Sequence, residues 1–429
     1  MSNSLSPIEL NDDFKYVLDA LEKTNQSLFV TGRAGTGKST LLRLFRDTTQ
    51  KKVVTLAPTG IAALNIGGQT IHSFFGFPPK ALSKADIRPR RNKSLYKKVD
   101  LIIIDEVSMI RADMMDNIDY FLRINRNDPR PFGGVHMVFF GDLFQLPPVI
   151  STEEEMVLMT SNYDSPYFFS AKVFSEYDFE MVELYKVYRQ ENRGFVRLLD
   201  RVRMNRIDYD DLETLNERYD PDLEDDDFYI TLAVTNLIVN QLNEQRLKRL
   251  LTPQVVFPSS TVGDVSGRTF PAEEILRLKE GAQVMFVKND KKRRYVNGTI
   301  GKIIQLTQNQ IIVEILDAKG TIKNLEVERE EWDIIKYRLN EKGDLEGKPI
   351  GTYKQYPLRL AWAITIHKSQ GKTFEKIIVN LGRGAFAAGQ TYVALSRCTT
   401  LGGIVLKTPI RPRDIMIDQR IIDFFENAR

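Results

Sequence analysis

The sequence is poor in cysteine and histidine, and this shortage excludes several kinds of site. Cys398 is the only cysteine, and there are three histidines in 429 residues. A disulfide framework and a metal site built from Cys and His are therefore excluded. His72 and His367 have no evident partners as metal ligands, and Cys398 is expected to pack as a buried thiol.

Long apolar runs and a large net charge are also missing. No window approaches the roughly 18 apolar residues of a membrane helix, and the N-terminus has no basic segment leading into an apolar one. These absences predict a soluble intracellular protein with no membrane contact. The 60 basic residues nearly balance the 57 acidic ones, giving a net charge of +3. A nucleic-acid site must therefore come from local clusters such as the basic 88–98 and 288–294, for which a solvated loop is the alternative.

The segment 31–40, TGRAGTGKST, matches the phosphate-binding pattern G-x-x-x-x-G-K-[ST]. A short apolar run before it predicts a strand, and apolar residues at helical spacing follow it. In that setting the glycines let backbone N–H groups point at phosphate oxygens at the positive end of a helix. An ordinary glycine-rich turn is the alternative. We expect ATP to bind here, with Lys38 on the β- and γ-phosphates and Ser39 on Mg²⁺, through Gly32, Gly35, Gly37, Lys38, Ser39 and Thr40.

Strand-like and helix-like segments alternate along most of the chain, which predicts an α/β fold with doubly wound parallel sheets. Apolar runs at 51–58, 99–108 and 135–142 belong to a first domain, residues 1–185, with a Pro-rich and basic arm at about 75–98. A second alternating domain is expected from 186–294 and 351–429. The β-rich stretch 295–350, which has Asn-Gly and Lys-Gly turns, predicts a small SH3-like insert between these parts.

Acidic and amide side chains follow two of the predicted strands. Asp105 and Glu106 end the run at 99–108, where one carboxylate could hold Mg²⁺ and the other could orient the attacking water. The alternative is a solvated strand end. Gln145 follows the run at 135–142 and is expected to contact both the γ-phosphate and a neighbouring domain. Arg189 and Arg397 could stabilise charge on the transferred phosphoryl group from across a cleft, although arginines are more often surface ion pairs.

The ordered set of motifs resembles the helicases of superfamily one. It comprises the phosphate loop, APTGIAALNIGGQTIHSFF (57–75), the Asp-Glu pair, GDLFQLPP (141–148), VYRQ (187–190), WAITIHKSQGKTF (362–374) and TYVALSRCTTLGGI (391–404). The QLPP, IHKSQG and ALSR strings are similar to those of the Pif-type and RecD-like branch of DNA helicases. The segment from Met115 to Phe140 resembles the connector of Pif-type members.

This resemblance implies two RecA-like motor domains and a path for single-stranded DNA across both. It implies DNA contacts at Thr59, Gly60, His72, Ser73, Phe74, Pro148, His367, Lys368 and Ser369, with Gln370 and Gly371 near the nucleotide. Hydroxyls and backbone N–H groups grip phosphates without reading sequence, and an aromatic such as Phe74 offers a stacking face. Core packing of Phe74 is an equal alternative.

Two positions depart from the family pattern. Phe14 stands about where relatives carry a glutamine for adenine recognition, and Tyr188 replaces a common phenylalanine. The first departure leaves the base preference open.

We therefore expect a DNA helicase that uses Mg²⁺ and ATP, moves 5′ to 3′ by resemblance, and acts on forked duplex or quadruplex DNA. An RNA-directed helicase of the same superfamily and an ATP-switched nucleic-acid clamp are the alternatives. The compact chain favours a bacterial, nucleoid-associated protein of the cytoplasm. The sequence does not fix the oligomeric state, for which we expect a monomer.

Overall fold

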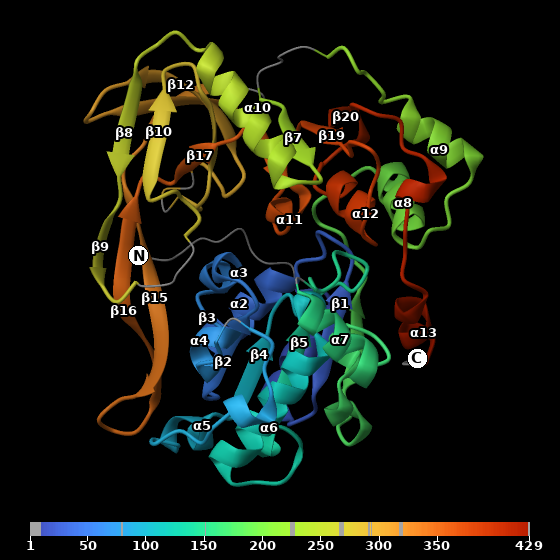
Figure 1. Cartoon of the computed structure of the whole chain (residues 1–429), viewed down its shortest axis with the longest axis vertical. Helices are drawn as coiled ribbons and strands as arrows, with labels where there is room; N and C mark the ends of the chain where they lie inside the picture. Colours follow the sequence, from blue (N-terminus) through green and yellow to red (C-terminus); the bar gives the residue numbers. More distant parts are fainter. Residues whose placement is uncertain are drawn as a thin grey trace.

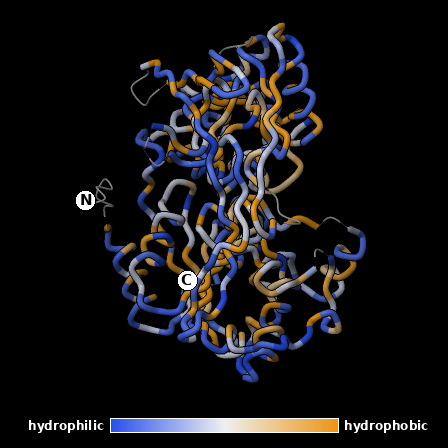
Figure 2. The backbone as a smooth tube through the Cα atoms, turned by 90° about the vertical axis from the view of Figure 1, so that its left-hand side faces the viewer, coloured by the Kyte–Doolittle hydropathy of each residue, from blue (hydrophilic) through white to orange (hydrophobic). Residues whose placement is uncertain are grey.

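The computed structural model of the chain has two lobes and a β-rich insert (Figure 1). It describes residues 10–78, 80–150, 152–223, 228–265, 270–290, 292, 294–316 and 321–427. The first lobe holds a six-stranded sheet, and the second holds a four-stranded sheet. Figure 2 shows hydrophobic and hydrophilic stretches alternating along the chain in both lobes. In the described residues no helix is long and apolar enough to cross a membrane.

The sheet of the first lobe is parallel throughout and has the order β3-β2-β4-β5-β1-β6. Its central strands are buried along their whole length, because helices cover a parallel sheet on both faces. The strands are β1 (Leu28–Gly32), β2 (Val53–Ala57), β3 (Gln69–Thr70), β4 (Leu101–Ile104), β5 (His136–Phe140) and β6 (Glu180–Leu184). The helices are α1 (Asp12–Lys23), α2 (Lys38–Thr48), α3 (Gly60–Ile66), α4 (Ile71–Phe75), α5 (Ser94–Lys98), α6 (Ala112–Arg126) and α7 (Glu153–Asn162).

The arm predicted at 75–98 leaves the sheet between β3 and β4 and packs on the lobe. Leu82, Ile87 and Tyr96 are buried in the same core as Phe121 of α6. The ring centroids of Tyr96 and Phe121 are 4.9 Å apart. The arm is therefore anchored by apolar contacts, while its basic residues stay on the surface.

The second lobe contains a parallel sheet of order β18-β7-β19-β20. The strands expected at 228–234, 375–382 and 402–409 are present, and so is the helix between the last two. Its strands are β7 (Ile230–Ala233), β18 (Ala363–Thr365), β19 (Ile377–Asn380) and β20 (Ile404–Leu406). Its helices are α8 (Arg193–Arg203), α9 (Tyr209–Asn216), α10 (Asn236–Arg249), α11 (Ile366–Ser369) and α12 (Gln390–Leu395).

The β-rich insert is larger than the predicted 295–350 and extends from Gln254 to Leu360. Its five-stranded sheet has the order β14-β13-β12-β11-β17, so strands on both sides of the predicted segment hydrogen-bond into it. The predicted insert was too short because the short strands on either side of the segment with the Asn-Gly and Lys-Gly turns have no sequence pattern that assigns them to it. The strands are β8 (Gln254–Pro258), β9 (Ser260–Gly263), β10 (Ile275–Lys279), β11 (Gln283–Phe286), β12 (Ile300–Leu306), β13 (Ile311–Leu316), β14 (Ile322–Glu326), β15 (Glu330–Leu339), β16 (Leu345–Gln355) and β17 (Leu358–Leu360).

The hairpin β15–β16 reaches from the insert to the first lobe (Figure 1). The hydroxyl of Tyr337 accepts a hydrogen bond from the backbone N–H of Thr55 at 3.1 Å, inside the first core. At the tip of the hairpin, Lys98 of α5 donates to the carbonyl of Gly343 at 2.6 Å. The insert is thus held at both ends, by the second lobe and by the first.

The last helix, α13 (Gln419–Asn427), corrects the predicted domain boundary at the C-terminus. The sequence pattern assigned 351–429 to the second domain, but Phe424 and Phe425 of α13 pack on the first lobe. The rings of Phe424 and Phe169 stack with centroids 4.2 Å apart, and Phe425 lies 5.0 Å from Phe144. The helix follows the second domain in the sequence, but its apolar face is buried against the aromatic cluster of the first lobe.

Candidate active site

The phosphate loop joins β1 to α2 in a conformation that only glycine adopts easily. Gly35 and Gly37 have φ angles of 86° and 87°, and Gly32 has 147°. A Cβ atom on Gly32 would lie 2.6 Å from the carbonyl oxygen of Leu184, so this position also needs glycine for space. Such a loop turns successive N–H groups toward one point at the start of a helix, which suits phosphate.

Lys38 begins α2, and its ammonium group folds back on the loop. Its Nζ donates to the carbonyls of Gly32 at 2.6 Å and Arg33 at 3.1 Å. Burial lowers the pKa of Lys38, while the carboxylates of Asp142 and Glu106 oppose that shift. The lysine charge predicted to meet the phosphates is therefore within electrostatic reach of the acidic residues after β4 and β5.

Asp105 and Glu106 follow β4 as two adjacent carboxyl groups, of which Asp105 is buried and Glu106 is half-buried. Burial, and then the neighbouring Glu106, raises the pKa of Asp105 to about 7. Burial also raises the pKa of Glu106, whereas Lys38 and Arg397 act in the opposite direction. Glu106 has a φ of 51°, a left-handed value, so the backbone leaves the extended conformation of the strand at this residue. The two carboxylates can thus serve different partners, as their predicted roles require.

The residues present fit Mg²⁺. The carboxylate of Asp105 and the hydroxyl of Ser39 in the first turn of α2 are hard oxygen ligands, which this ion prefers. A cation there would also relieve the repulsion between the adjacent carboxylates. The described part of the chain holds no cluster of three or more His, Cys, Asp or Glu residues that could bind a metal. A magnesium ion would therefore complete its shell with water and phosphate oxygens, its common mode with nucleotides.

The structure brings both predicted arginines to this cleft. The guanidinium of Arg189 donates to the carbonyl of Ser396 at 3.1 Å, and Arg397 donates to the Ser396 hydroxyl at 2.9 Å. Burial, and then the charge of Arg397, lowers the pKa of Arg189 to about 9. Arg397 is 1% exposed, its pKa is lowered by burial, and Glu106 is among the groups that oppose the shift. The alternative of a surface ion pair is therefore wrong for Arg397.

Arg189 also packs directly on the phosphate loop. A Cβ on Gly35 would lie 2.6 Å from the Cβ of Arg189, and the N–H of Tyr188 donates to the carbonyl of Gly35 at 2.9 Å. The segment 187–190 therefore runs from β6 across the loop and reaches the second lobe at Ser396. This connection places Arg189 between the two lobes.

Gln145 contacts the neighbouring lobe, as predicted. Its Oε1 accepts from Nε2 of Gln370 at 3.4 Å, and its own Nε2 donates to Asp142 at 3.2 Å. The backbone around Gln145 also touches Gly389 at the start of α12, where a Cβ would lie 2.3 Å from the Gln145 carbonyl oxygen. Gly371, the residue after Gln370, lies in an exposed turn and has a φ of 74°.

Two residues of the interface, Arg203 and Tyr392, were not predicted from the sequence. Arg203 is 5% exposed and forms an ion pair with Asp142 at 3.2 Å, with its guanidinium 4.0 Å from the ring centroid of Phe144. The hydroxyl of Tyr392 accepts from the N–H of Ala34 in the phosphate loop at 3.0 Å. A signal for Arg203 was available, since it lies four residues after Leu199 on the apolar face of α8.

Phe14, the departure at the adenine position, is a packing residue in this structure. It is 2% exposed, and a Cβ on Gly37 would lie 2.9 Å from its ring. Tyr188 is 41% exposed, with its ring centroid 6.2 Å from that of Phe14. A cavity of about 800 Å³ opens beside Tyr188 and is also lined by Arg33 of the phosphate loop.

The residues predicted to contact DNA in the first lobe lie at the starts of two short helices. Thr59 caps α3, and its hydroxyl oxygen accepts from the N–H of Ala62. His72 is partly buried in α4, which lowers its pKa, and the hydroxyl of Ser73 accepts from Gln69. Gly60 begins α3 next to the exposed Thr59.

Phe74 is 5% exposed and packs edge-on against Phe75 and Tyr96. The structure shows core packing for this side chain, because Tyr96 of the arm and Tyr337 of the hairpin β15–β16 pack against its ring.

In the second lobe the predicted DNA residues cluster at α11. Lys368 is exposed, and burial lowers the pKa of His367. Ser369 is 0% exposed, and its hydroxyl donates to the carbonyl of Ile366, so it supports the helix. Pro148, also buried, follows Gln145 in the first lobe. The exposed cation at Lys368 is the group in this set that is best placed for a phosphate.

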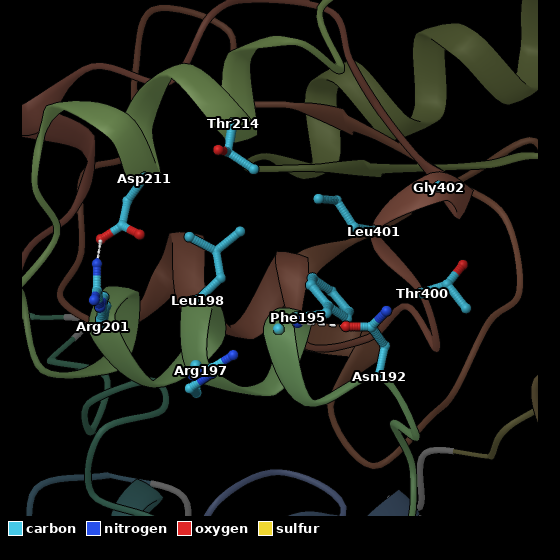
Figure 3. A pocket seen from close by; sticks show the side chains of 11 residues that line it. Asn192, Phe195, Arg197, Leu198, Arg201, Asp211, Thr214, Thr400, Leu401 and Gly402 are labelled. Carbon is cyan, nitrogen blue, oxygen red and sulfur yellow. Dashed lines mark hydrogen bonds and ion pairs between the residues drawn. The ribbon is translucent and has the colours of Figure 1, made fainter.

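A separate cavity of about 610 Å³ lies within the second lobe (Figure 3). Phe195, Leu198 and Leu401 point into it, and Arg201 pairs with Asp211 at its rim. None of the predicted catalytic, nucleotide or DNA residues lines this cavity, although Thr400, Leu401 and Gly402 belong to the motif at 391–404.

Comparison with known proteins identifies the family. Residues 9–210 match the PIF1-like helicase family, and residues 267–306 match the 2B domain of DNA helicase Pif1. A Pif1 helicase of Bdellovibrio bacteriovorus is 33% identical over 98% of this chain and 92% of its own length. The chain spans only 63% of the Emericella nidulans relative and 64% of the human one.

Solved structures agree in sequence and fold. Bacteroides Pif1 in complex with ADP-AlF4 is 36% identical, with a TM-score of 0.90 over 98% of this chain and 97% of the other. The same protein bound to single-stranded DNA gives 0.71 with equal identity and coverage. A further structure concerns unwinding at forked duplex DNA by two coordinating Pif1 helicases. The resemblance found in the motifs is confirmed, as is the α/β fold with RecA-like sheets, and the chain belongs to the PIF1-like helicase family.

Proposed function

We propose that this protein is an ATP-dependent DNA helicase that moves 5′ to 3′ on single-stranded DNA and opens forked duplex or quadruplex DNA. One observation carries the proposal. Lys38 of the first lobe and the buried Arg397 of the second both lower the pKa of Glu106, so groups from the two lobes act on one carboxylate at the lobe interface. A cleft shared in this way links nucleotide chemistry to the relative position of the lobes.

The proposal assigns a role to each residue of the cleft. Lys38 and the loop N–H groups bind the β- and γ-phosphates, and Mg²⁺ held by Ser39 and Asp105 would neutralise the charge that develops on them. Glu106 orients the attacking water and takes its proton. Arg189 and Arg397 stabilise the transferring phosphoryl group, and Gln145 reports its presence to Gln370.

Movement follows from the same contacts. ATP gives the arginines a counter-charge, so its binding favours closure of the lobes, and hydrolysis removes this advantage. Closure shifts Thr59 and α4 relative to α11, and with them the grip on the strand. Helicase relatives and the Bacteroides structures with single-stranded and forked DNA support DNA as the track.

Direction and location rest on the family resemblance and on the sequence. We take movement as 5′ to 3′, and a monomer in a bacterial cytoplasm, as part of the proposal. Unwinding of quadruplex DNA also rests on the family resemblance and is part of the proposal.

The test is strand displacement on matched partial duplexes with a 5′ or a 3′ single-stranded tail, with Mg²⁺-ATP and a trap strand. The 5′-tailed substrate is expected to open faster, and single-stranded DNA is expected to stimulate ATP hydrolysis. Preferential opening of the 3′-tailed substrate would contradict the direction. Stimulation by RNA alone would instead assign the motor to RNA, and no hydrolysis with saturating DNA would favour a clamp.

A further inference from the structure

Arg203, the last residue of α8 in the second lobe, reaches into the first lobe. Its Nη2 forms an ion pair with Oδ1 of Asp142 at 3.2 Å, and its Nη1 lies 3.6 Å from Oε1 of Glu183 on β6. The guanidinium also lies against the ring of Phe144, whose centroid is 4.0 Å from the guanidinium carbon. Arg203 is 5% exposed and Asp142 is 1% exposed, so the ion pair is enclosed between the lobes.

The two oxygens of the Asp142 carboxylate have different partners. Oδ1 accepts from Arg203 and also from the backbone N–H of Phe144, each at 3.2 Å. Oδ2 accepts from Nε2 of Gln145 at 3.2 Å. The carboxylate therefore joins a guanidinium of the second lobe to a side-chain amide of the first.

The contact with Asp142 sets the orientation of the Gln145 amide. A carboxylate only accepts hydrogen bonds, so the nitrogen of the amide has to face it. The amide oxygen is then turned toward the second lobe, where Oε1 of Gln145 accepts from Nε2 of Gln370 at 3.4 Å. An amide held at both ends is oriented before the reaction begins, so the transition state does not have to reorganise it.

These contacts cross the lobe interface twice. Arg203 and Gln370 belong to the second lobe, whereas Asp142 and Gln145 belong to the segment that follows β5 in the first. Separation of the lobes would break the ion pair and the contact between the two amides together. The Gln145 amide would then lose both of its constraints, so its orientation depends on contact between the lobes.

We propose that Arg203 is a positioning residue for ATP hydrolysis, which holds the Asp142 carboxylate and thereby orients the amide of Gln145 while the lobes are in contact. The inference rests on the proposed function and deepens it, because it assigns the orientation of Gln145 to a residue outside the motifs. Arg203 acts through Asp142 rather than on the phosphates.

Direct contact of Arg203 with a phosphate is the alternative role. Its Nε is buried and has no hydrogen-bond partner among the described residues, so this donor of the guanidinium is unused. The other two nitrogens face the carboxylates of Asp142 and Glu183, and the ring of Phe144 covers the group. The geometry therefore favours a role in holding Asp142. A direct contact would act independently of Gln145, which an experiment can detect.

The test is a double-mutant cycle on the full chain. Steady-state ATPase kinetics at saturating oligothymidylate give kcat and KM, and a fluorescent nucleotide gives the binding affinity. Arg203→Met and Gln145→Ala are each expected to lower kcat by about tenfold or more, with a change of less than about threefold in nucleotide affinity. If Arg203 acts through Gln145, Arg203→Met should lower kcat by less than about threefold in the Gln145→Ala background.

Two further variants decide the question if Arg203→Met does not fold. Arg203→Lys keeps the charge without the planar fork and should retain part of kcat. Arg203→Met combined with Asp142→Asn leaves no unpaired carboxylate in the buried site, and should have the kcat of Asp142→Asn alone. Arg123→Met removes the cation that pairs with Asp119 on α6, and this control should leave kcat unchanged. Thermal unfolding of each variant shows whether its fold is intact.

The outcomes separate this inference from the proposed function. A wild-type protein that hydrolyses no ATP with single-stranded DNA would overturn the function itself. Wild-type hydrolysis with an unchanged kcat in folded Arg203→Met, or in folded Gln145→Ala, would overturn the inference alone. Equal losses from Arg203→Met in the two backgrounds would also contradict it, because the arginine would then act without Gln145. In that case a parallel loss of nucleotide affinity would assign Arg203 to the phosphates, and a lowered melting temperature would make it structural.

Discussion

The nucleotide cleft and the junction of the second lobe with the insert both bury charge between elements that are distant in sequence, but they balance it differently. In the cleft, Lys38, Arg203 and Arg397 face Asp105, Glu106 and Asp142, so the protein supplies both signs. At the insert, Glu273 is the carboxylate that acts on Arg359 and Lys368, and no acidic group of the described residues acts on Lys372.

This difference separates two kinds of binding site. A cleft with balanced charge keeps its shape when its ligand leaves, and it can position reacting groups before the reaction begins. A site with charge of one sign depends on its ligand, and its affinity should vary with salt and pH. The predictions below test this contrast, beginning with the largest expected effect.

Loss of the lysine charge should abolish the function of the cleft. Lys38→Ala is expected to lower ATP turnover by about 10³-fold or more, because the phosphates lose their point counter-charge in a buried site. Glu106→Gln should differ in kind, since it keeps nucleotide binding and single-strand affinity while hydrolysis stalls. Steady-state ATPase rates and equilibrium binding of a fluorescent nucleotide distinguish the two. If the Glu106→Gln protein cannot bind nucleotide, the role of orienting the attacking water has been given to the wrong carboxylate.

Removal of an arginine should affect the rate more than binding. Arg397→Ala and Arg189→Ala are each expected to cost about 10³ in turnover, the magnitude of an arginine finger acting in cis. Nucleotide affinity should change much less, because the arginines act on charge that develops in the transition state. The measurement is kcat and KM together with thermal unfolding. A lowered melting temperature with unchanged kcat per folded molecule would make these arginines structural.

The contact between Tyr392 and the phosphate loop should have a moderate effect. Tyr392→Phe removes the hydroxyl that accepts from the N–H of Ala34. A single buried hydrogen bond contributes about 1 kcal/mol, so nucleotide binding or turnover should change by roughly three- to tenfold. Tyr167→Phe, which removes a hydroxyl bonded to Asp418 away from the cleft, is the matched control. Equal kinetics of the two variants would show that the Tyr392 contact does not couple the lobes.

The smallest expected effect is a pH dependence of DNA binding beside α11, where Lys372 is 9% exposed and its Nζ donates to Oδ1 of Asn297 at 2.8 Å. The pKa of Lys372 is about 8, below the usual value for lysine, and bound phosphate would raise it. The affinity due to this charge is therefore complete below pH 8 and is lost as the pH rises above it, by at most about tenfold per pH unit. Arg359, Lys368 and Glu273 are the charged groups that face this region, and the pKa of Lys368 is also lowered.

Lys372→Arg should flatten this pH profile, because arginine stays charged throughout the range. The measurement is oligothymidylate affinity from pH 7 to 9 at constant ionic strength. Profiles that coincide for the wild type and Lys372→Arg would show that Lys372 does not contribute to DNA binding.

Local sequence determined the elements whose residues are close together in the chain. The phosphate loop, the Asp-Glu pair at the end of β4 and the alternating strands of both sheets depend on short-range patterns of glycine, charge and hydrophobicity. The structure confirms these elements with small shifts in their bounds. The resemblance to a family, carried by the same local strings, was also available before any coordinates.

Tertiary structure decided everything that depends on which distant segments meet. Tyr392 reaches a loop 358 residues earlier, and Arg203 pairs with Asp142 across the lobes. Hydrogen bonds between strands set the limits of the insert. The position of α13 is set by its packing against the aromatic cluster of the first lobe. Phe74 is buried because the arm and the hairpin cover it, and Lys372 is enclosed because the loop at Asn297 closes over it. Burial and charge balance arise from the sum of such contacts, and for that reason no short stretch of the sequence could specify them.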